Sequence, residues 1–470
     1  MHKIVFGVML IVLIAGCAQN TDFNKALSGD VKQQPVQELV QDIETNATMD
    51  KDLQIEGSRD SKLESQSKRL HEYGIDCSHE NEYGTRRSLA IDPQNSNILY
   101  IGIEGRGVYK TTDKGTSWEK IINGLVAYPD MSNKNELCFP DIAYIYIDPA
   151  NTKRVLMVTS DITTAYVDWP YGETGGIWES LDGGESWKQM IKGKINVAGS
   201  GYLAVDPKNS RIMYYPVNPD LPTFKEAPIK ESLNKISSVY KTVDGGITWE
   251  ELNMPMLPAL QAILISIDPK DSNHVVLFTQ SHDHIYGENS ITEIFLHKQY
   301  PIMESFDAGK TWTVSGDNLP DPYRAVFEGD VSGNNFGHMI VRLFLFGPEF
   351  PPETTKQKSF YSVDGGKTFE ETSMFIWIAR YNPHDMTANN MLGYSPWQGW
   401  VAESKDAGKT WQSIGIPPEV QSYKVKVENF VWDPKDSSAV YMSGTYGNIW
   451  QSIDGGKTWK NILNLDKLPK

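Results

Sequence analysis

The sequence predicts an all-β protein, a single seven-bladed β-propeller with four-stranded antiparallel blades. Two observations predict it: a short turn-forming pattern occurs seven times, and an apolar segment ending in Asp-Pro stands upstream of most copies. Repeats of roughly 40 to 50 residues with strand and turn signals are typical of propellers. Successive copies of the turn pattern are 42 to 69 residues apart, which allows one blade per copy plus inserted loops.

The turn pattern is an octet, Ser/Thr-x-Asp-x-Gly-x-Ser/Thr-aromatic, as in Ser180 to Trp187. Its Asp can accept hydrogen bonds from backbone N–H groups of a tight turn, its Gly can adopt a positive φ, and its hydroxyls can cap the loop. The aromatic residue begins the returning strand, so each octet predicts a strand, a turn and a strand. The octets are defined by Asp113, Asp182, Asp244, Asp307, Asp364, Asp406 and Asp454.

The Asp-Pro segments complete each blade as strands a to d. Strand a runs up to Asp-Pro, because proline cannot donate to a sheet and ends the strand at a turn; strand b follows it, strand c runs up to the octet and strand d leaves it. The fifth blade has no Asp-Pro, and its strands a and b are placed loosely within Tyr323 to Phe346. The repeat region begins before a strand a and ends after a strand d, so closure of the ring by an exchanged strand is not expected.

Strand parity divides the propeller into two faces. The a–b and c–d turns share one face, the turn face, and the b–c and d–a connections share the opposite face, the loop face. Blades 1, 6 and 7 have short b–c loops, whereas blades 2 to 5 carry long ones, and long loops on a rigid scaffold are the usual place for binding or catalysis. The long loops are Ser160 to Gly175, Pro216 to Ile236, Gln280 to Tyr300 and Gly347 to Lys358.

Charge and composition restrict the partners. The 470 residues carry a formal net charge of −16, which argues against a nucleic-acid surface, since that would need a basic stripe. An anionic polymer is disfavoured for the same reason. We expect a protein or polysaccharide ligand, a monomeric protein and no cofactor.

The N-terminal segment predicts export and membrane attachment. Residues 1–17 combine Lys3, an apolar run and Leu-Ile-Ala-Gly-Cys17, which resembles a bacterial lipoprotein signal peptide with Cys17 as the lipidation site. Ala18 after this cysteine favours the outer membrane in a Gram-negative cell. Residues 18–72 are polar and poor in aromatic residues, so they predict a flexible tether, and residues 73–470 form the propeller.

The octets resemble the Asp-box, or BNR, repeat of sialidases, xyloglucanase-type glucanases, sortilin-type receptors and photosystem II assembly propellers. In these families the Asp-box lies away from the active face, so the resemblance implies a structural role for the seven aspartates. No Arg-Ile-Pro motif occurs, and Arg211 falls on the turn face, so a true sialidase is disfavoured. No arginine patch of the assembly-propeller kind is evident in the sequence.

The blade 2 loop holds the main candidate site residues. Its carboxylates suit a catalytic pair and its aromatic rings suit stacking on sugars, although a solvated protein-binding loop can have the same composition. Thr159-Ser-Asp161-Ile162 resembles a xyloglucanase segment with a catalytic Asp, but Thr163-Thr164 replaces the glycine pair of that family, whose cleft lies between two propellers. The catalytic candidates are Asp161, Asp168, Glu173 and Asp283, and the ligand-binding candidates are Tyr166, Trp169, Tyr171 and, in the blade 6 turn, Trp397.

Two further candidates concern metal and disulfide chemistry. His282 and His284 could supply two metal ligands, but two histidines in a polar loop are more often solvated. Cys77 and Cys138 each precede a strand a of neighbouring blades, and an exported location permits oxidation, so we predict a disulfide between them.

Three functions are compatible with this sequence. The first, which we favour, is a membrane-anchored module without enzymatic activity that binds or assembles a protein or glycan through the loops of blades 2 to 5. The alternative is a xyloglucanase-like glycoside hydrolase, whose inverting carboxylates would stand roughly 6.5 to 9.5 Å apart. A sortilin-like peptide receptor ranks last, because it needs a wider ring.

Overall fold

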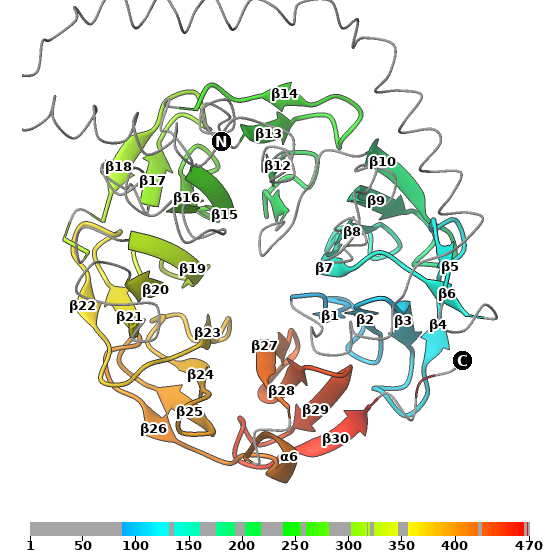
Figure 1. Cartoon of the computed structure of the whole chain (residues 1–470). Coiled ribbons are helices and arrows are strands. Elements are labelled where there is room, and N and C mark those ends of the chain that lie inside the picture. Colours follow the sequence, from blue (N-terminus) through cyan, green and yellow to red (C-terminus); the bar gives the residue numbers. More distant parts are fainter. Residues whose placement is uncertain are drawn as a thin grey trace, which may run out of the picture. The chain divides into compact units, whose positions relative to one another are not determined.

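The computed structural model describes residues 87–130, 136–159, 175–192, 203–217, 238–254, 260–281, 302–316, 318–319, 324–345, 356–421, 425–464 and 468. All described residues belong to the second of two units into which the chain divides, Leu63–Lys470. Within that unit, seven four-stranded antiparallel sheets stand around a ring (Figure 1). The predicted seven-bladed β-propeller is therefore confirmed.

Each blade consists of four strands that follow one another along the chain and lie side by side in the same order, from the axis of the ring outwards (Figure 1). Blade 1 comprises β1 (Ala90–Ile91), β2 (Leu99–Ile103), β3 (Gly107–Thr111) and β4 (Glu119–Lys120), and blade 2 comprises β7 (Ile142–Ile147), β8 (Val155–Thr159), β9 (Gly176–Ser180) and β10 (Lys188–Lys192). Blade 3 comprises β11 (Ala204–Val205), β12 (Met213–Val217), β13 (Ser238–Thr242) and β14 (Glu250–Glu251), and blade 4 comprises β15 (Leu260–Ile267), β16 (Val275–Ser281), β17 (Ile302–Ser305) and β18 (Thr313–Ser315). Blade 5 comprises β19 (Arg324–Val331), β20 (Met339–Leu345), β21 (Lys356–Ser362) and β22 (Glu370–Glu371). Blade 6 comprises β23 (Ile378–Tyr381), β24 (Met391–Ser395), β25 (Trp400–Ser404) and β26 (Gln412–Ser413). Blade 7 comprises β27 (Val427–Asp433), β28 (Asp436–Gly444), β29 (Asn448–Ser452) and β30 (Lys460–Leu463).

Two elements were not predicted. A two-stranded sheet of β5 (Tyr128–Pro129) and β6 (Leu137–Cys138) lies in the connection between blades 1 and 2, and a short helix, α6 (Pro418–Gln421), connects blades 6 and 7. In the part of the chain that the structure describes, no helix is long and apolar enough to cross a membrane.

All seven octets form the same hydrogen-bonded turn between strands c and d. In the blade 2 octet, Ser180 Oγ donates to Asp182 Oδ1 at 2.7 Å, the Gly184 N–H donates to Ser180 Oγ at 2.7 Å, and Ser186 donates from its N–H and its Oγ to the two Asp182 oxygens. Donation by Ser186 and Ser180 lowers the pKa of Asp182 to about 2. This carboxylate is saturated with donors of its own turn, which fits a structural role.

Each octet also bonds to the a–b turn of its own blade. The N–H that follows the octet Asp donates to a carbonyl of that turn, as Gly183 does to Lys153 at 2.8 Å and Ala407 does to Asn389 at 2.9 Å. Equivalent bonds occur in all seven blades. The predicted turn face, on which both kinds of turn meet, is thus confirmed, and Arg211 lies on it, since its carbonyl accepts from Gly245.

The apolar core consists of seven clusters, and each lies at the junction of two neighbouring blades. At the closing junction, Tyr441, Ile449 and Leu463 of blade 7 pack with residues of blade 1 that include Leu99 and Ile101. Blade 1 and blade 7 each keep their own four strands, so the ring closes without strand exchange, as expected. Of the aromatic residues two positions before the octets, Tyr109, Trp178, Phe360 and Trp450 are buried.

Side chains of the a–b turns form a second ring of contacts around the turn face. In six blades the residue two positions after the strand-a Asp, or its equivalent, donates to a carbonyl of the next blade's turn. The pairs are Gln94 to Pro149, Lys208 to Lys270, Lys270 to Asn334, Asn334 to Pro383, His384 to Asp433 and Lys435 to Gln94. The last of these links joins blade 7 to blade 1.

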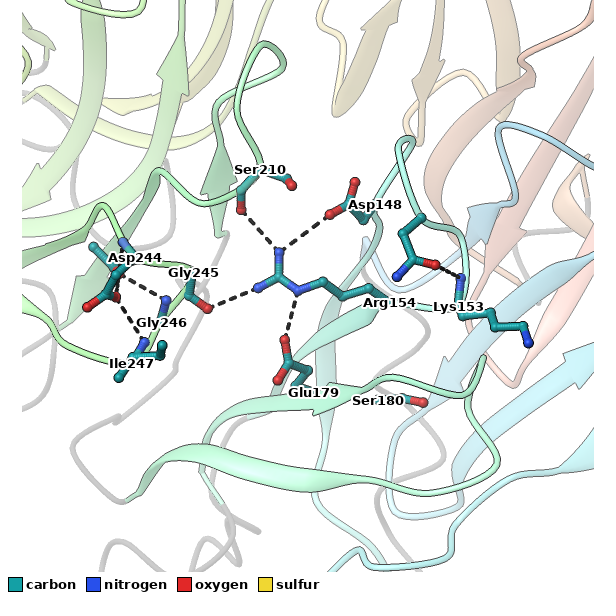
Figure 2. A network of polar contacts seen from close by, with 12 residues as sticks. Asp148, Lys153, Arg154, Glu179, Ser180, Ser210, Asp244, Gly245, Gly246 and Ile247 are labelled. Carbon is teal, nitrogen blue, oxygen red and sulfur yellow. Dashed lines mark hydrogen bonds and ion pairs between the residues drawn. The ribbon is translucent and has the colours of Figure 1, made fainter.

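Blade 2 lacks this link because Ala150 occupies the position, and Arg154 connects blades 2 and 3 instead (Figure 2). Its guanidinium donates to the blade 3 carbonyls of Ser210 at 3.1 Å and Gly245 at 3.0 Å. It also pairs with Glu179 at 2.8 Å and Asp148 at 3.5 Å. One arginine, whose side chain is 12% exposed, thus joins two blades and pairs with two carboxylates.

The fifth blade has the predicted strands without the Asp-Pro signal. Strands β19 and β20 fall within Tyr323 to Phe346, and Ser332 stands where the other blades have Asp or Asn. Its hydroxyl accepts from the N–H groups of Asn334 and Asn335 at 3.3 Å, as the Asp92 carboxylate does in blade 1. A hydroxyl therefore replaces the carboxylate in this turn.

Candidate functional site

The loop face is organised as strand parity predicted. The b–c turn of blade 1 bonds to the d–a connection that leads into blade 2: the Phe139 N–H donates to the Gly105 carbonyl at 3.1 Å, and the Gly105 N–H donates to Asp141 Oδ1 at 3.3 Å. The b–c loops of blades 1, 6 and 7 are short, and those of blades 2 to 5 are long, although β21 begins at Lys356 and so includes Lys358.

Most sequence-predicted site residues lie outside the described part of the chain. They are Asp161, Tyr166, Asp168, Trp169, Tyr171, Glu173, His282, Asp283 and His284, together with Cys17 and Cys77. Cys138 is described, buried and disulfide-bonded. Its partner lies outside the described residues, so the pairing with Cys77 remains a prediction. Among the residues that are described, no group of three or more His, Cys, Asp or Glu side chains could hold a metal ion.

Trp397 is the one ligand-binding candidate that the structure describes. It lies in the short b–c turn of blade 6, on the loop face, and its side chain is 56% exposed. Its ring stacks on buried Phe375, with centroids 4.3 Å apart and an interplanar angle of 27°. Phe375 comes from the connection that leads into β23, so two loop-face segments form an aromatic platform, Trp397 on Phe375.

The backbone holds this platform in place. The Gly399 N–H donates to the Pro396 carbonyl at 3.2 Å, and Ser395 Oγ bonds to Gln398 within the same turn. Gly399 has φ of 63°, which this turn requires and which glycine adopts at low cost. The exposed indole is therefore carried by a closed turn rather than by a long loop.

A second group of side chains lies near the propeller axis, on the innermost strands. Glu328 of β19 pairs with Arg87, which precedes β1, and with Arg380 of β23, whose Nη1 is 3.0 Å away. Arg380 Nε also donates to Asn429 Oδ1 of β27 at 2.8 Å. This axial cluster joins residues that are far apart in the sequence.

The arginines control the charge of Glu328. Burial opposes ionisation of its carboxyl, but the charges of Arg87, Arg380 and Arg342 outweigh burial and lower its pKa to about 2. Two residues along, burial raises the pKa of Asp330 above its ordinary value, although Arg380 and Arg87 oppose this. At neutral pH Glu328 is an ionised acceptor and cannot serve as a general acid.

A pocket adjoins the axial cluster at the junction of blades 5 and 6. Its cavity volume is about 10 Å³, room for about one water molecule, and its lining contains Glu328, Arg342 and Trp377. The Arg342 guanidinium lies over the Trp377 ring, 3.9 Å from its centre, and Trp377 meets Phe375 edge to face at 6.4 Å. Aromatic contacts thus run from exposed Trp397 through Phe375 to the polar pocket.

Sequence reasoning missed the axial cluster and the pocket. It found no arginine patch, whereas the structure gathers Arg87, Arg342 and Arg380 around one carboxylate. The available signal was alternation: Glu328 and Asp330 occupy alternating positions of one innermost strand. Their partners lie on other blades and cannot be paired with them from spacing alone.

The chain resembles xyloglucanases over most of its length. It is 21% identical over 378 residues to the xyloglucanase Xgh74A of Acetivibrio thermocellus, a match that covers 74% of this chain and 41% of that protein. It is 21% identical over 423 residues to the oligoxyloglucan-reducing end-specific xyloglucanase of Emericella nidulans, covering 82% of this chain and 46% of that protein.

The structural comparison agrees in fold. The crystal structure of an ancestral GH74 enzyme matches 80% of this chain and 46% of that one, with a TM-score of 0.56 and 14% identity. No family model matches the sequence. The chain therefore spans less than half the length of the curated relatives and the solved structure compared, and with the latter it shares the β-propeller fold.

Proposed function

We propose that this protein acts on a neutral plant-type β-glucan as a glycoside hydrolase of the xyloglucanase kind. The observation that carries the proposal is the similarity to two xyloglucanases over 74% and 82% of the chain. Asp161 is the first candidate for a catalytic carboxylate, with Asp168, Glu173 or Asp283 as its partner across the loop face.

The test is hydrolysis of purified xyloglucan by the protein without residues 1–17, measured as released reducing ends. Asp161→Asn should lower the rate by about 100-fold or more, the typical contribution of a general acid or base. Glu185→Gln is the matched control, because Glu185 is an exposed carboxylate of the turn face, and it should leave the rate unchanged. No release by the unaltered protein, or equal rates for both variants, would refute the hydrolase.

A binding module without hydrolysis is the second candidate. It is favoured by the exposed ring of Trp397, stacked on Phe375 on the loop face, because an aromatic surface can bind a sugar without any catalytic group. In the same assay such a module would be retained on insoluble glucan and release no sugar.

Membrane attachment through Cys17 belongs to the same proposal. It rests on the apolar run that ends at Cys17 and on the polar composition of residues 18–72. Mass spectrometry of the mature N-terminus should find acyl chains on Cys17, and an unmodified N-terminus elsewhere in the chain would contradict it.

A further inference from the structure

The turn face carries most of the large exposed apolar side chains in the part of the chain that the structure describes. Eleven such side chains are found there, and seven of them belong to the turn face, with exposed fractions between 51% and 82%. Single exposed apolar residues are normal, but their concentration on one face is typical of an interaction surface. These seven form what we call the apolar ring: Leu181, Val243, Ile247, Phe306, Val363, Met386 and Ile453.

The chemistry of the turns does not require these apolar residues. Five of the seven occupy the second position of an octet, directly after the last residue of strand c, and an apolar side chain makes none of the hydrogen bonds of the turn. Blades 1 and 6 form the same turn with Thr112 and Lys405 at this position. Another cause than the fold of the octet is therefore needed for the apolar ring.

The repeat places the second octet positions at one level. In every blade the octet bonds to its own a–b turn in the same way, and the seven blades stand around one axis. Equivalent octet positions therefore lie at similar heights along the axis, and their exposed side chains surround it without forming a groove. A flat partner can contact these side chains together, whereas a small ligand can reach only one or two of them.

Lysines stand beside the apolar ring. The octet aspartates accept hydrogen bonds within their own turns, as Asp307 does from the N–H and the hydroxyl of Thr311. A lysine side chain is longer than that of aspartate, so its ammonium group reaches farther from the turn. Exposed apolar side chains next to lysines are typical of surfaces that bind lipid headgroups. In blades 4 to 7 the sixth octet position is an exposed lysine: Lys310, Lys367, Lys409 and Lys457.

We propose that the turn face binds a lipid bilayer: the apolar ring enters the interfacial layer, and the lysines of the sixth octet positions contact lipid phosphates. The attachment at Cys17 would keep the propeller beside the same bilayer, since residues 18–86 span at most about 250 Å when extended. That argument rests on the proposed function, whereas the location of the surface rests on the described turns. In this orientation the loop face points away from the membrane.

Flotation with lipid vesicles tests this surface. The protein without residues 1–17 is mixed with vesicles of phosphatidylethanolamine and phosphatidylglycerol, so that no acyl chain contributes to binding. The unaltered protein should float with the vesicles. A double variant, Ile247→Ser with Ile453→Ser, should bind about tenfold more weakly, because two side chains that are 82% and 71% exposed no longer enter the lipid.

The matched control is a second double variant, Leu137→Ser with Val314→Ser. These apolar residues are 51% and 38% exposed, but they belong to β6 and β18, outside the turn face. This variant should float like the unaltered protein, and melting temperatures establish that both variants are folded. Equal binding by the two double variants, or no flotation of the unaltered protein, would overturn the membrane-binding surface.

Two further measurements separate the bilayer from other flat partners. A dimer in size-exclusion chromatography that the isoleucine double variant dissociates would show that a second copy covers the turn face. Retention on insoluble glucan that the same variant loses would show that a polysaccharide covers it. Either result would overturn the membrane-binding surface.

Hydrolysis is measured separately from flotation. Both double variants should release sugar from xyloglucan at the rate of the unaltered protein, because the catalytic candidates belong to the opposite face. Flotation that depends on the two isoleucines, without release of sugar by any of the proteins, supports the membrane-binding surface and refutes the hydrolase. Release of sugar without flotation supports the hydrolase and refutes the surface.

Discussion

Blades 2 and 4 place a cation between two carboxylates at equivalent positions of the turn face, but they use different cations. In blade 2, Arg154 lies between Asp148 and Glu179. In blade 4, His274 lies 3.4 Å from Asp268 and 3.5 Å from Glu304. The arginine is charged at every relevant pH and reaches into blade 3, whereas the histidine is charged only at lower pH.

The difference shows how one position serves two purposes. Arg154 replaces the turn-to-turn link that Ala150 cannot make, because its guanidinium has enough donors for two carboxylates and two carbonyls. Blade 4 has its own link through Lys270, and His274 meets blade 5 through a ring contact with Phe336 rather than through hydrogen bonds to its carbonyls. The permanently charged residue, Arg154, therefore stands at the junction of blades 2 and 3, where no other side chain of the a–b turn makes the link.

The largest effect is expected from Arg154→Ala. It leaves the Asp148 and Glu179 carboxylates without this cation and the Ser210 and Gly245 carbonyls without this donor. Breaking a partly buried ion pair of this kind costs up to about 3 kcal/mol. The melting temperature should fall by several degrees in differential scanning calorimetry. Arg211→Ala, which removes an exposed arginine of the neighbouring turn, should have little effect; equal losses for the two would contradict the special role of Arg154.

Arg154→His converts the blade 2 arrangement into that of blade 4. Imidazole cannot reach both blade 3 carbonyls, so the variant should be less stable than the unaltered protein at every pH. The deficit in melting temperature should be smaller at pH 5 than at pH 9, because only the imidazolium compensates the two carboxylates. A deficit that does not depend on pH would show that charge balance is unimportant at this position.

His274 should give the unaltered protein a pH-dependent part of its stability. Burial lowers the pKa of His274, but Glu304 and Asp268 outweigh burial, so the pKa is raised above its ordinary value. A raised pKa means that this stabilisation is complete below about pH 6.5 and is lost as pH rises through the folded-state pKa. The difference in melting temperature between the unaltered protein and His274→Gln should therefore shrink with rising pH.

The smallest effect is expected from Ala150→Lys. A lysine here can donate to a blade 3 carbonyl, as Lys208 and Lys270 do to the blades that follow theirs. An exposed link of this kind is worth up to about 1 kcal/mol. Ala150→Met controls for the added aliphatic chain, and an equal gain from methionine would exclude the polar link as the cause.

The fold could be predicted because its signals are local. An octet contains all donors and acceptors of its own turn, and Asp-Pro ends a strand by the chemistry of proline, so seven blades can be counted along the chain. Blade 5 shows how robust the period is, since Ser332 replaces the usual Asp and the strands still fall where spacing placed them. The short sheet of β5 and β6 lacked such a signal.

The candidate site was less predictable because it depends on ring closure. Trp397 could be identified from a short turn, but its partner Phe375 lies on another segment. Arg87 meets Glu328, 241 residues away, only because seven successive blades bring the first strand opposite the fifth blade. The strand and turn pattern within one blade does not indicate that two residues 241 positions apart will meet.

The junction of blades 5 and 6 differs from the other six in how little apolar surface blade 5 contributes to it. Among the described residues, its apolar cluster takes a single buried side chain, Ile340, from blade 5. The pocket with Arg342 and Trp377 occupies the same junction. Hydrogen bonds connect the two blades here: the Tyr381 N–H donates to Asp330 Oδ2 at 3.0 Å, the Ile376 N–H donates to Ser359 Oγ at 2.8 Å, and Ser359 Oγ donates to the Ile376 carbonyl at 2.8 Å. The cohesion of this junction should therefore depend more on directional polar contacts than that of the other six.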